Sequence, residues 1–485
     1  MRGYPTAQCV HSRLMQVKEH KALNPDTDHP EPVSEITMFD LLHPSSELTI
    51  RRDQGVLDPN CHADTEKFHG GIGSLDLLRA LRGSRQKQRP LSLTVQLPSN
   101  LRSSCCSLLD VSCKCSEVDN YLQHLEREID LIGCHLGADQ RVEQFHLAGG
   151  TPAIAHLQRL MSHLRSRFNF LDHESGDYSI EVDLHHTDWS TMGLLRNQGF
   201  NHVSIGVPDI DADCDRSVAC YQNPAPIQSL MDAARTFGFR SINVDLGFGH
   251  AWQTPDSFAL KLATIIELEP DRLMVFDYAR PPRRYRPVLG DKVRALCSQD
   301  DKGAMRQICF DQLLCAGYHY IGLRQFVRPD DDLAVAQERG RLRRTCEGFS
   351  RHGYCDHAGF GLGAISQIDD LYTQNTDEIE RYQQQLDMKQ LPTCRGWRFE
   401  AGDQIRHMVM ERLSCDQELD IRAIERRYGL VFSKYFSAVW PLLEQLSRDG
   451  LIELSDRFIS ILPAGRPEVD AICNLFEKDL GGAKH

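Results

Sequence analysis

The sequence predicts an α/β protein built on a partial or full parallel (β/α) barrel, followed by a mainly helical C-terminal domain. Two observations predict this fold. From residue 93 onward, short β-rich runs alternate with amphipathic helical stretches, a pattern typical of parallel sheets with right-handed crossovers. After about residue 370 the alternation stops, and helical stretches precede a short pair of strands.

The individual elements follow from hydrophobic periodicity. The predicted strands are 93–97, 144–147, 179–182, 202–205, 241–246, 272–276 and 318–323. The predicted helices among them are 118–132, 154–167, 227–237 and 256–266. Beyond the barrel we expect helices at 377–389, 403–414 and 436–449, then strands 451–454 and 458–462, an order that resembles a winged helix.

Three domains are predicted from these elements. Residues 1–90 are polar and weakly periodic, with a helical signal only near 72–81, and we interpret them as a partly ordered N-terminal arm. The barrel occupies 91–370 and the helical domain 371–485. This last segment has no marked basic excess, so we expect it to pack over the barrel mouth and not to bind DNA.

Composition excludes several classes of protein. The 485 residues carry a net charge of -13, which argues against a nucleic-acid-binding surface, because such a surface needs basic residues. No apolar run reaches the roughly 18 residues of a membrane span, and the first residues lack the apolar core of a signal peptide. We therefore expect a cytoplasmic monomer that binds neither nucleic acid nor membrane.

The cysteines fall into two groups. Of the 17, scattered ones such as Cys134, Cys297 and Cys309 lie on apolar helical faces and are expected to fill the core. Cys105, Cys106, Cys113 and Cys115 instead cluster just after the first predicted strand. In a reducing compartment, thiols at such short spacing indicate a metal or iron–sulfur site.

Polar and glycine-containing turns follow the predicted strands. The C-terminal ends of parallel strands form the active face of α/β folds, so these turns are candidate binding segments. Each also has an ordinary structural interpretation. Gly149-Gly150 can be a tight turn, and Glu181 or Asp245 can be a helix cap or an ion-pair partner.

Several short blocks, in their order and spacing, together resemble the oxygen-independent coproporphyrinogen III oxidase family, a branch of the radical S-adenosylmethionine enzymes. The resemblance runs from about Leu91 to about Leu475, and Tyr4-Pro5-Thr6-Ala7 is similar to the family's N-terminal motif. The blocks are Ala148-Gly149-Gly150-Thr151-Pro152, Ser179-Ile180-Glu181-Val182-Asp183, Asn243-Val244-Asp245-Leu246, Gln253-Thr254-Pro255-Asp256-Ser257-Phe258, Arg328-Pro329-Asp330-Asp331-Asp332-Leu333-Ala334 and Gly363-Ala364-Ile365-Ser366.

The resemblance implies a radical S-adenosylmethionine-type barrel with a 4Fe-4S cluster held by cysteines at C-x3-C-x2-C. It implies radical oxidative decarboxylation of coproporphyrinogen III to protoporphyrinogen IX, a step of haem and porphyrin biosynthesis, with a tetrapyrrole as substrate or ligand. The residues it assigns to S-adenosylmethionine are Gly149, Gly150, Thr151, Glu181, Asp245, Ala279 and Ile365.

The chain departs from the family at the cysteine loop. An ungapped alignment places Asn100, Ser104 and Ser107 at the three ligand positions. A six-residue insertion gives a better match, because Cys106-x3-Asp110-x2-Cys113-x-Cys115 then mirrors the family's C-x3-C-x2-C-x-C. We prefer this second alignment, in which Cys106, Asp110 and Cys113 are the metal ligands and either Cys105 or Cys115 can take the third position instead of Asp110.

Other family side chains are replaced as well. Thr94 and Gln96 stand where the family has tyrosine and histidine on the first strand. Pro208 replaces a glutamine, Cys220 an arginine that contacts S-adenosylmethionine, and Gln325 a histidine. Several side chains that would contact charged groups of the ligand are therefore missing.

Three functions remain open from the sequence. The first is an active but diverged coproporphyrinogen III dehydrogenase, and the second is a catalytically silent paralogue (a pseudoenzyme) that binds a tetrapyrrole or a partner protein. The third is a thiol or zinc site that uses the four clustered cysteines, although neighbouring side chains such as Cys105 and Cys106 point apart.

Overall fold

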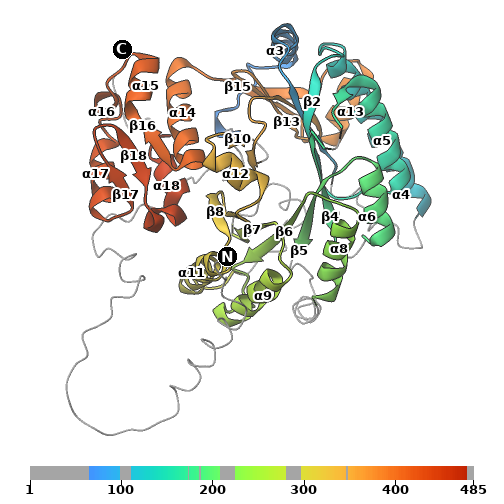
Figure 1. The fold of residues 1–485 in the computed structure, drawn as a ribbon. Helices are drawn as coiled ribbons and strands as arrows, with labels where there is room; N and C mark the ends of the chain where they lie inside the picture. Colours follow the sequence, from blue (N-terminus) through green and yellow to red (C-terminus); the bar gives the residue numbers. More distant parts are fainter. Residues whose placement is uncertain are drawn as a thin grey trace, which may run out of the picture. The chain divides into compact units, whose positions relative to one another are not determined.

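The computed structural model of the chain describes residues 65–98, 111–172, 174–184, 187–207, 224–279, 296–345 and 348–477. Contacts divide the chain into residues 1–52 and 53–485, and every described residue belongs to the second unit. This unit contains one large sheet flanked by helices and a smaller region of helices and short strands near the C-terminus (Figure 1).

The centre of the large sheet is a run of parallel strands. Its order is β12-β1-β2-β4-β5-β6-β7, and each neighbouring pair is parallel. The bounds are β1 Leu91–Gln96, β2 Arg141–Ala148, β4 Asp177–Asp183, β5 His202–Val207, β6 Ser241–Phe248, β7 Arg272–Asp277 and β12 Asp356–Gly361. This parallel sheet with helical crossovers confirms the predicted fold class.

The barrel is partial, because antiparallel strands extend the sheet at both ends. Strands β13 Ile365–Ile368, β14 Leu371–Asn375 and β15 Thr393–Arg398 continue from β12, and the boundary predicted near residue 370 therefore falls within one sheet. At the other end, β9 Gln325–Val327 lies between β7 and β8 His319–Gly322, antiparallel to both. The seventh predicted strand is β8, and β9, which was not predicted, separates it from β7.

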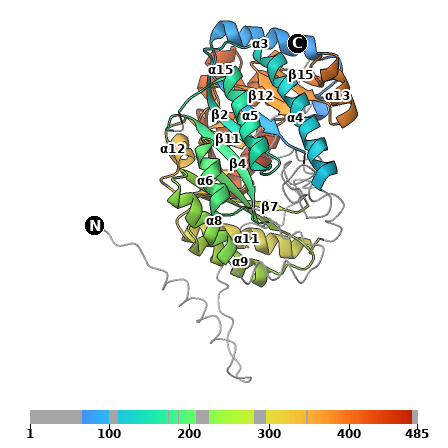
Figure 2. The same ribbon diagram turned by 90° about the vertical axis from the view of Figure 1, so that its right-hand side faces the viewer.

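Helices connect the parallel strands. They are α4 Val111–Gly133, α5 Ile154–Arg167, α6 Trp189–Asn197, α8 Ala225–Thr236, α9 Pro255–Glu267, α11 Gln299–Cys315 and α12 Asp332–Glu338. Their apolar faces pack on the sheet, as Leu157, Leu160 and Leu164 of α5 illustrate. Figure 2 shows α4, α5, α6 and α8 along one side of the sheet.

Local sequence explains where these helices begin. Helix α9 starts at Pro255, a residue favoured in the first turn, and the Thr254 side chain accepts a hydrogen bond from the Ser257 N–H. The Ser257 side chain bonds back to the Thr254 backbone, which completes a capping box. This end of α9 lies beside the C-terminal end of β6, so the cap helps to define the loop between them.

Strand β1 is buried on both faces. Leu91, Leu93 and Val95 are fully buried and Thr94 is only 3% exposed, although the sequence of the strand alternates apolar and polar residues. Strands of a parallel sheet are typically covered on both faces. β1 therefore lies in the middle of the protein, and the segment that follows it leaves from a rigid position.

Part of the predicted N-terminal arm is folded onto the sheet. Helix α3 Ser74–Lys87 buries Leu77 and Leu81, and the His69 N–H donates to the Gly396 carbonyl of β15 at 2.9 Å. A 3₁₀ turn, η1 Thr65–Lys67, precedes them.

The C-terminal region combines helices with a small antiparallel sheet of order β16-β18-β17. Its elements are α13 Ile379–Asp387, α14 Ala401–Asp416, β16 Glu418–Asp420, α15 Ile421–Tyr428, α16 Phe432–Tyr435, α17 Trp440–Arg448, β17 Ile452–Leu454, β18 Phe458–Ile461, η6 Pro463–Glu468 and α18 Val469–Asn474. Two further pairings lie outside this region. Strands β10 Arg343–Thr345 and β11 Gly348–Ser350 form a separate hairpin, and β3 Asn169–Phe170 pairs with β2. The predicted strands 451–454 and 458–462 are β17 and β18, whereas β16 was not predicted.

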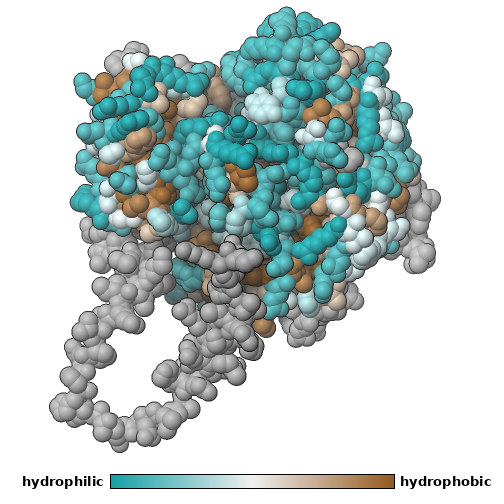
Figure 3. All heavy atoms as spheres, viewed as in Figure 1, coloured by the Kyte–Doolittle hydropathy of each residue, from teal (hydrophilic) through white to brown (hydrophobic). Residues whose placement is uncertain are grey.

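The surface of this unit is mixed in character. In the view of Figure 3 hydrophilic residues cover much of the described surface, with hydrophobic groups scattered between them. None of the helices in the described part of the chain combines the length and the hydropathy that crossing a bilayer requires.

Candidate functional site

The glycine pair after β2 lies at the C-terminal end of the parallel strands. Gly149 and Gly150 have φ values of 96° and 97°, in the region that favours glycine. A Cβ at Gly149 would lie 2.0 Å from the Leu97 carbonyl oxygen, just after β1. The backbones that follow β1 and β2 therefore touch, and only glycine fits at this turn.

Glu181 of β4 holds this turn in place. Its Oε2 accepts a hydrogen bond from the Gly149 N–H at 3.1 Å, and its carbonyl accepts one from the Thr151 hydroxyl at 3.1 Å. The Nε2 of His146 lies 3.6 Å from Oε1 of Glu181. The structure thus brings together four of the residues assigned to S-adenosylmethionine, namely Gly149, Gly150, Thr151 and Glu181.

Asp245 lies in the C-terminal half of β6, toward the same end of the parallel sheet. It is 1% exposed, and its Oδ1 accepts a hydrogen bond from the Asn243 amide at 2.7 Å. The Ser204 hydroxyl lies 3.3 Å from Oδ2, and the same amide group donates to Ser204 at 2.7 Å. This network links β5 to β6 and fixes the orientation of the carboxylate.

The two remaining predicted residues differ in their surroundings. Ala279 follows β7 and is exposed, with its N–H donating to Oδ1 of Asp277 at 2.8 Å. Ile365 begins β13 and is buried in a small apolar cluster with Phe68 and Tyr372. The assignment of both to the cofactor stays a prediction.

A charged pair on this face was not predicted from the sequence. Nζ of Lys302, from α11, lies 3.5 Å from Oδ1 of Asp277 at the end of β7, and the lysine side chain is only 7% exposed. Gly249, after β6, packs against the same lysine, because a Cβ there would lie 3.1 Å from its Cε. The only sequence signal is a glycine directly after a strand.

The predicted metal ligands cannot be placed. Cys106 and Asp110 lie outside the described residues, as do Pro208 and Cys220. The backbones of Cys113 and Cys115 belong to the beginning of helix α4, but their side chains are outside the described part of the structure. The ligand set Cys106, Asp110, Cys113 and Cys115 therefore remains a prediction.

Helix α4, which contains Cys113 and Cys115, is fixed by a buried carboxylate. Glu128 is fully buried and accepts hydrogen bonds from the Gly361 N–H at 2.9 Å, the Asn375 amide at 2.6 Å and the Tyr382 hydroxyl at 2.7 Å. These donors belong to the end of β12, to β14 and to α13. Tyr121 adds a bond from its hydroxyl to the Gln96 carbonyl of β1 at 3.0 Å.

We expect Glu128 to make stability depend on pH. Burial raises the pKa of Glu128 from its ordinary value of 4.5 to about 7, although its three hydrogen bonds oppose that rise. The folded state therefore keeps a proton that the unfolded chain releases, so the stabilisation is complete below pH 4.5 and is lost as the pH rises through 7. Between those limits the loss amounts to roughly 3 kcal/mol.

Glu128→Gln removes this titration. In urea unfolding, the wild-type chain should lose up to ~3 kcal/mol more than the variant when the pH is raised from about 5 to about 8. Tyr382→Phe removes one hydrogen bond that lowers the pKa of Glu128. In this variant the loss of stability should therefore occur at higher pH than in the wild type. A difference between wild type and Glu128→Gln that is the same at every pH would contradict this role.

Comparisons with known proteins agree with this geometry. The HemN C-terminal domain family matches residues 400–467. Oxygen-independent coproporphyrinogen III oxidase of Pseudomonas aeruginosa is 43% identical over 454 residues, covering 91% of this chain and 97% of that protein. The enzyme of the same name from Escherichia coli K12 is 37% identical over 425 residues, covering 85% of this chain and 91% of that protein.

A solved structure extends the match to the fold. Coproporphyrinogen III oxidase (HemN) from Escherichia coli, described as a radical SAM enzyme, superimposes with a TM-score of 0.76 at 36% identity and covers 86% of this chain and 96% of that one. The partial parallel barrel with its glycine turn after β2 is therefore a radical S-adenosylmethionine-type scaffold. The chain belongs to the oxygen-independent coproporphyrinogen III oxidase family.

Proposed function

We propose that this chain is a coproporphyrinogen III oxidase-like protein of haem biosynthesis, which binds S-adenosylmethionine and a tetrapyrrole at the C-terminal ends of its parallel strands. The family reaction is the oxidative decarboxylation of coproporphyrinogen III to protoporphyrinogen IX. The single observation that supports the proposal most strongly is the Gly149 turn. It is held against the end of β1 by Glu181, at the end of the sheet from which the cysteine loop departs.

The residues present fit S-adenosylmethionine. The left-handed backbone of Gly149 and Gly150 shapes this turn, and Gly150 carries no side chain that would keep a ligand from its backbone. Glu181 and Asp245 place two carboxylates on the same face, and carboxylates accept hydrogen bonds from amino and hydroxyl groups. When bound with a reduced 4Fe-4S cluster, this cofactor supplies the radical that removes a hydrogen atom from a propionate side chain.

The donor set for the cluster fits less well. At the family positions Cys106 and Cys113 offer thiolates, but Asp110 offers a carboxylate, which is a harder ligand than an iron–sulfur cluster favours. On β1, the buried Thr94 and the partly exposed Gln96 replace an aromatic ring and an imidazole. These substitutions favour a second candidate function, a catalytically silent paralogue that binds a tetrapyrrole or a partner protein.

One experiment separates the two functions. The chain is reconstituted anaerobically with iron and sulfide, reduced with dithionite and examined by electron paramagnetic resonance, and deoxyadenosine formed from S-adenosylmethionine is measured. An active oxidase should give a 4Fe-4S signal and deoxyadenosine. A silent paralogue should give neither, yet should still change the Soret absorbance of added coproporphyrin.

Each result decides a different point. A cluster signal without deoxyadenosine would contradict the oxidase function although the metal site is intact. If S-adenosylmethionine and coproporphyrin both fail to bind in equilibrium dialysis, the binding face proposed above is wrong, and only a role with a partner protein is left.

A further inference from the structure

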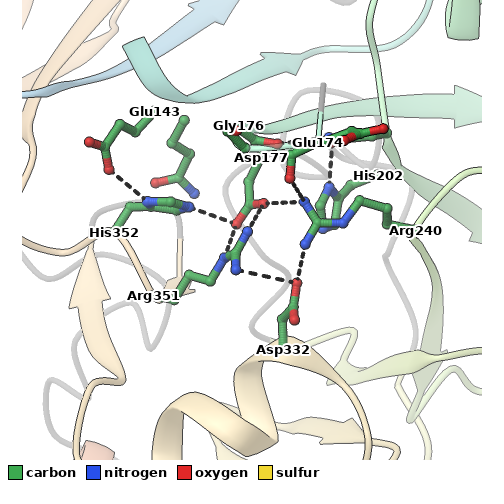
Figure 4. Close-up of polar contacts among 12 residues, drawn as sticks. Glu143, Glu174, Gly176, Asp177, His202, Arg240, Asp332, Arg351 and His352 are labelled. Atoms are coloured by element: carbon green, nitrogen blue, oxygen red, sulfur yellow. Dashed lines mark hydrogen bonds and ion pairs between the residues drawn. The ribbon is translucent and has the colours of Figure 1, made fainter. Parts of the chain in front are cut away.

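The opposite end of the parallel strands carries a second cluster of charged and polar side chains (Figure 4), among them residue types that can hold a metal ion. Glu143 lies near the start of β2, and Asp177 is the first residue of β4. His352 and Cys355 belong to the loop that joins β11 to β12. Gly149 follows Glu143 by six positions along the extended strand β2, which is roughly 20 Å, so this cluster is distinct from the face described above.

We propose that Glu143, His352 and Cys355 bind a zinc ion that ties β2 to the loop before β12. One carboxylate oxygen, one imidazole nitrogen and one sulfur from these residues all lie within 4.8 Å of one another. His352 Nδ1 and Glu143 Oε2 are 3.1 Å apart. That is close to the separation of two ligands around tetrahedral zinc, whose bonds to nitrogen and oxygen are about 2.0 to 2.2 Å.

The other ring nitrogen of His352 is already oriented as in a metal-bound histidine. Its Nε2 lies 2.9 Å from Oδ2 of Asp177. Two bonds of 2.7 Å from the Arg351 guanidinium hold this carboxylate in turn. A ligating imidazole usually donates its second N–H to a carboxylate, which fixes the tautomer and aims the first nitrogen at the metal.

The thiol is supplied by a short turn. The Cys355 N–H donates to the His352 carbonyl at 3.0 Å, so the two ligands of the His-x-x-Cys segment are held close together. Within the described residues the Cys355 sulfur makes no hydrogen bond, and the residue is only partly buried. The sulfur is therefore available to a metal, and water can complete a fourth position.

A neighbouring trio is less suited to a cation. Oxygen atoms of Asp177 and Asp332 lie within reach of a nitrogen of His202. However, Arg240 and Arg351 both pair with Asp177 and with Asp332, as the dashed lines in Figure 4 show. Two guanidinium groups already neutralise these carboxylates and would repel a metal ion. Glu143 faces one guanidinium, that of Arg141 at 3.7 Å from Oε1, and accepts a hydrogen bond from the Tyr354 hydroxyl at Oε2.

The charges balance when the ion is bound. In the metal-free cluster each ring nitrogen of His352 lies beside a carboxylate. Zinc binding needs an Nδ1 without a proton and a thiolate at Cys355, and the protons displaced pass to solvent. The ion, one thiolate and one carboxylate then sum to zero, so burial of the metal leaves no net charge.

The test measures zinc retained by the full chain. The protein is incubated with zinc, passed through a desalting column and analysed for metal, and its thermal unfolding is followed with and without zinc. Cys355→Ser and His352→Gln should each lose about one zinc ion per chain and the zinc-dependent rise in Tm. Asp177→Asn, which removes the charge of the orienting carboxylate and weakens its pairs with Arg240 and Arg351, should weaken zinc binding by about 10- to 100-fold.

Controls separate this site from the cysteine loop. Cys134→Ser changes an exposed cysteine elsewhere and should retain the ion, as should Cys113→Ala. With cobalt in place of zinc, the thiolate charge-transfer absorption should disappear in Cys355→Ser. If His352→Gln does not fold, Cys355→Ser still tests the proposal. The Cys355 sulfur makes no hydrogen bond among the described residues, so its replacement should leave the fold intact. Zinc content unchanged in Cys355→Ser, or absent in the wild type, would overturn the proposal.

Discussion

Gly149→Ala is expected to abolish binding of S-adenosylmethionine and to lower the free energy of unfolding by about 3 kcal/mol or more. The alanine Cβ would lie 2.0 Å from the Leu97 carbonyl oxygen and 2.9 Å from its carbonyl carbon. These are backbone atoms of a buried segment, so they cannot move aside as the end of a flexible side chain could. The φ of 96° adds strain of its own.

Two measurements check this expectation. Equilibrium dialysis with S-adenosylmethionine reports the loss of binding, and urea unfolding reports the loss of stability. The matched control is Gly303→Ala in α11, where an added Cβ would meet nothing within 4 Å. That change should leave binding intact and alter stability by less than about 1 kcal/mol, in the stabilising direction. A Gly149→Ala chain that binds normally would contradict the role given to this turn.

Asp110→Cys should restore a full set of three thiolates if the alignment with Cys106 and Cys113 is correct. After anaerobic reconstitution the variant should hold about four iron atoms per chain, and its 4Fe-4S signal should exceed that of the wild type. The reason is chemical: thiolate is a softer ligand than carboxylate and suits a low-potential iron–sulfur cluster. Iron analysis and electron paramagnetic resonance measure the gain.

The controls test position as well as thiol count. Asp119→Cys adds a cysteine at an exposed site farther along α4 and should not raise the iron content. Cys113→Ala in the Asp110→Cys background should remove the cluster. If Asp110→Cys brings no more iron than Asp119→Cys, the six-residue insertion is wrong, and the alignment that places Asn100, Ser104 and Ser107 at the ligand positions is favoured.

The sequence predicted the elements whose signals are local. Helix α5 has the predicted bounds, Ile154–Arg167, because its apolar residues recur at helical spacing. Strand β12 was not predicted, since Asp356–Gly361 contains aspartate, histidine, alanine and two glycines, residues that favour strands weakly. Its neighbours β1 and β13 impose the strand conformation, which no local pattern can reveal.

The same distinction holds for the candidate site. Gly149, Glu181 and Asp245 follow or end predicted strands, so a parallel sheet places them on one face. The pairing of Lys302 with Asp277 depends on how α11 packs against α9 near the end of β7, and a buried lysine has no local signature. Glu128 was also missed, because its partners Asn375 and Tyr382 lie more than two hundred residues away.

The position of β1 in the sheet also limits the order in which the chain can fold. Leu91 pairs on one side with Val142 and on the other with Asp356. During synthesis at about 5 to 20 residues per second, roughly 13 to 50 seconds pass between the appearance of β1 and that of β12. For that time one hydrogen-bonding edge of a strand that is buried in the native protein has no partner, which is a hazard for aggregation. Completion of the sheet is therefore a late event, and chaperone demand should be greatest while residues 100–355 are being made.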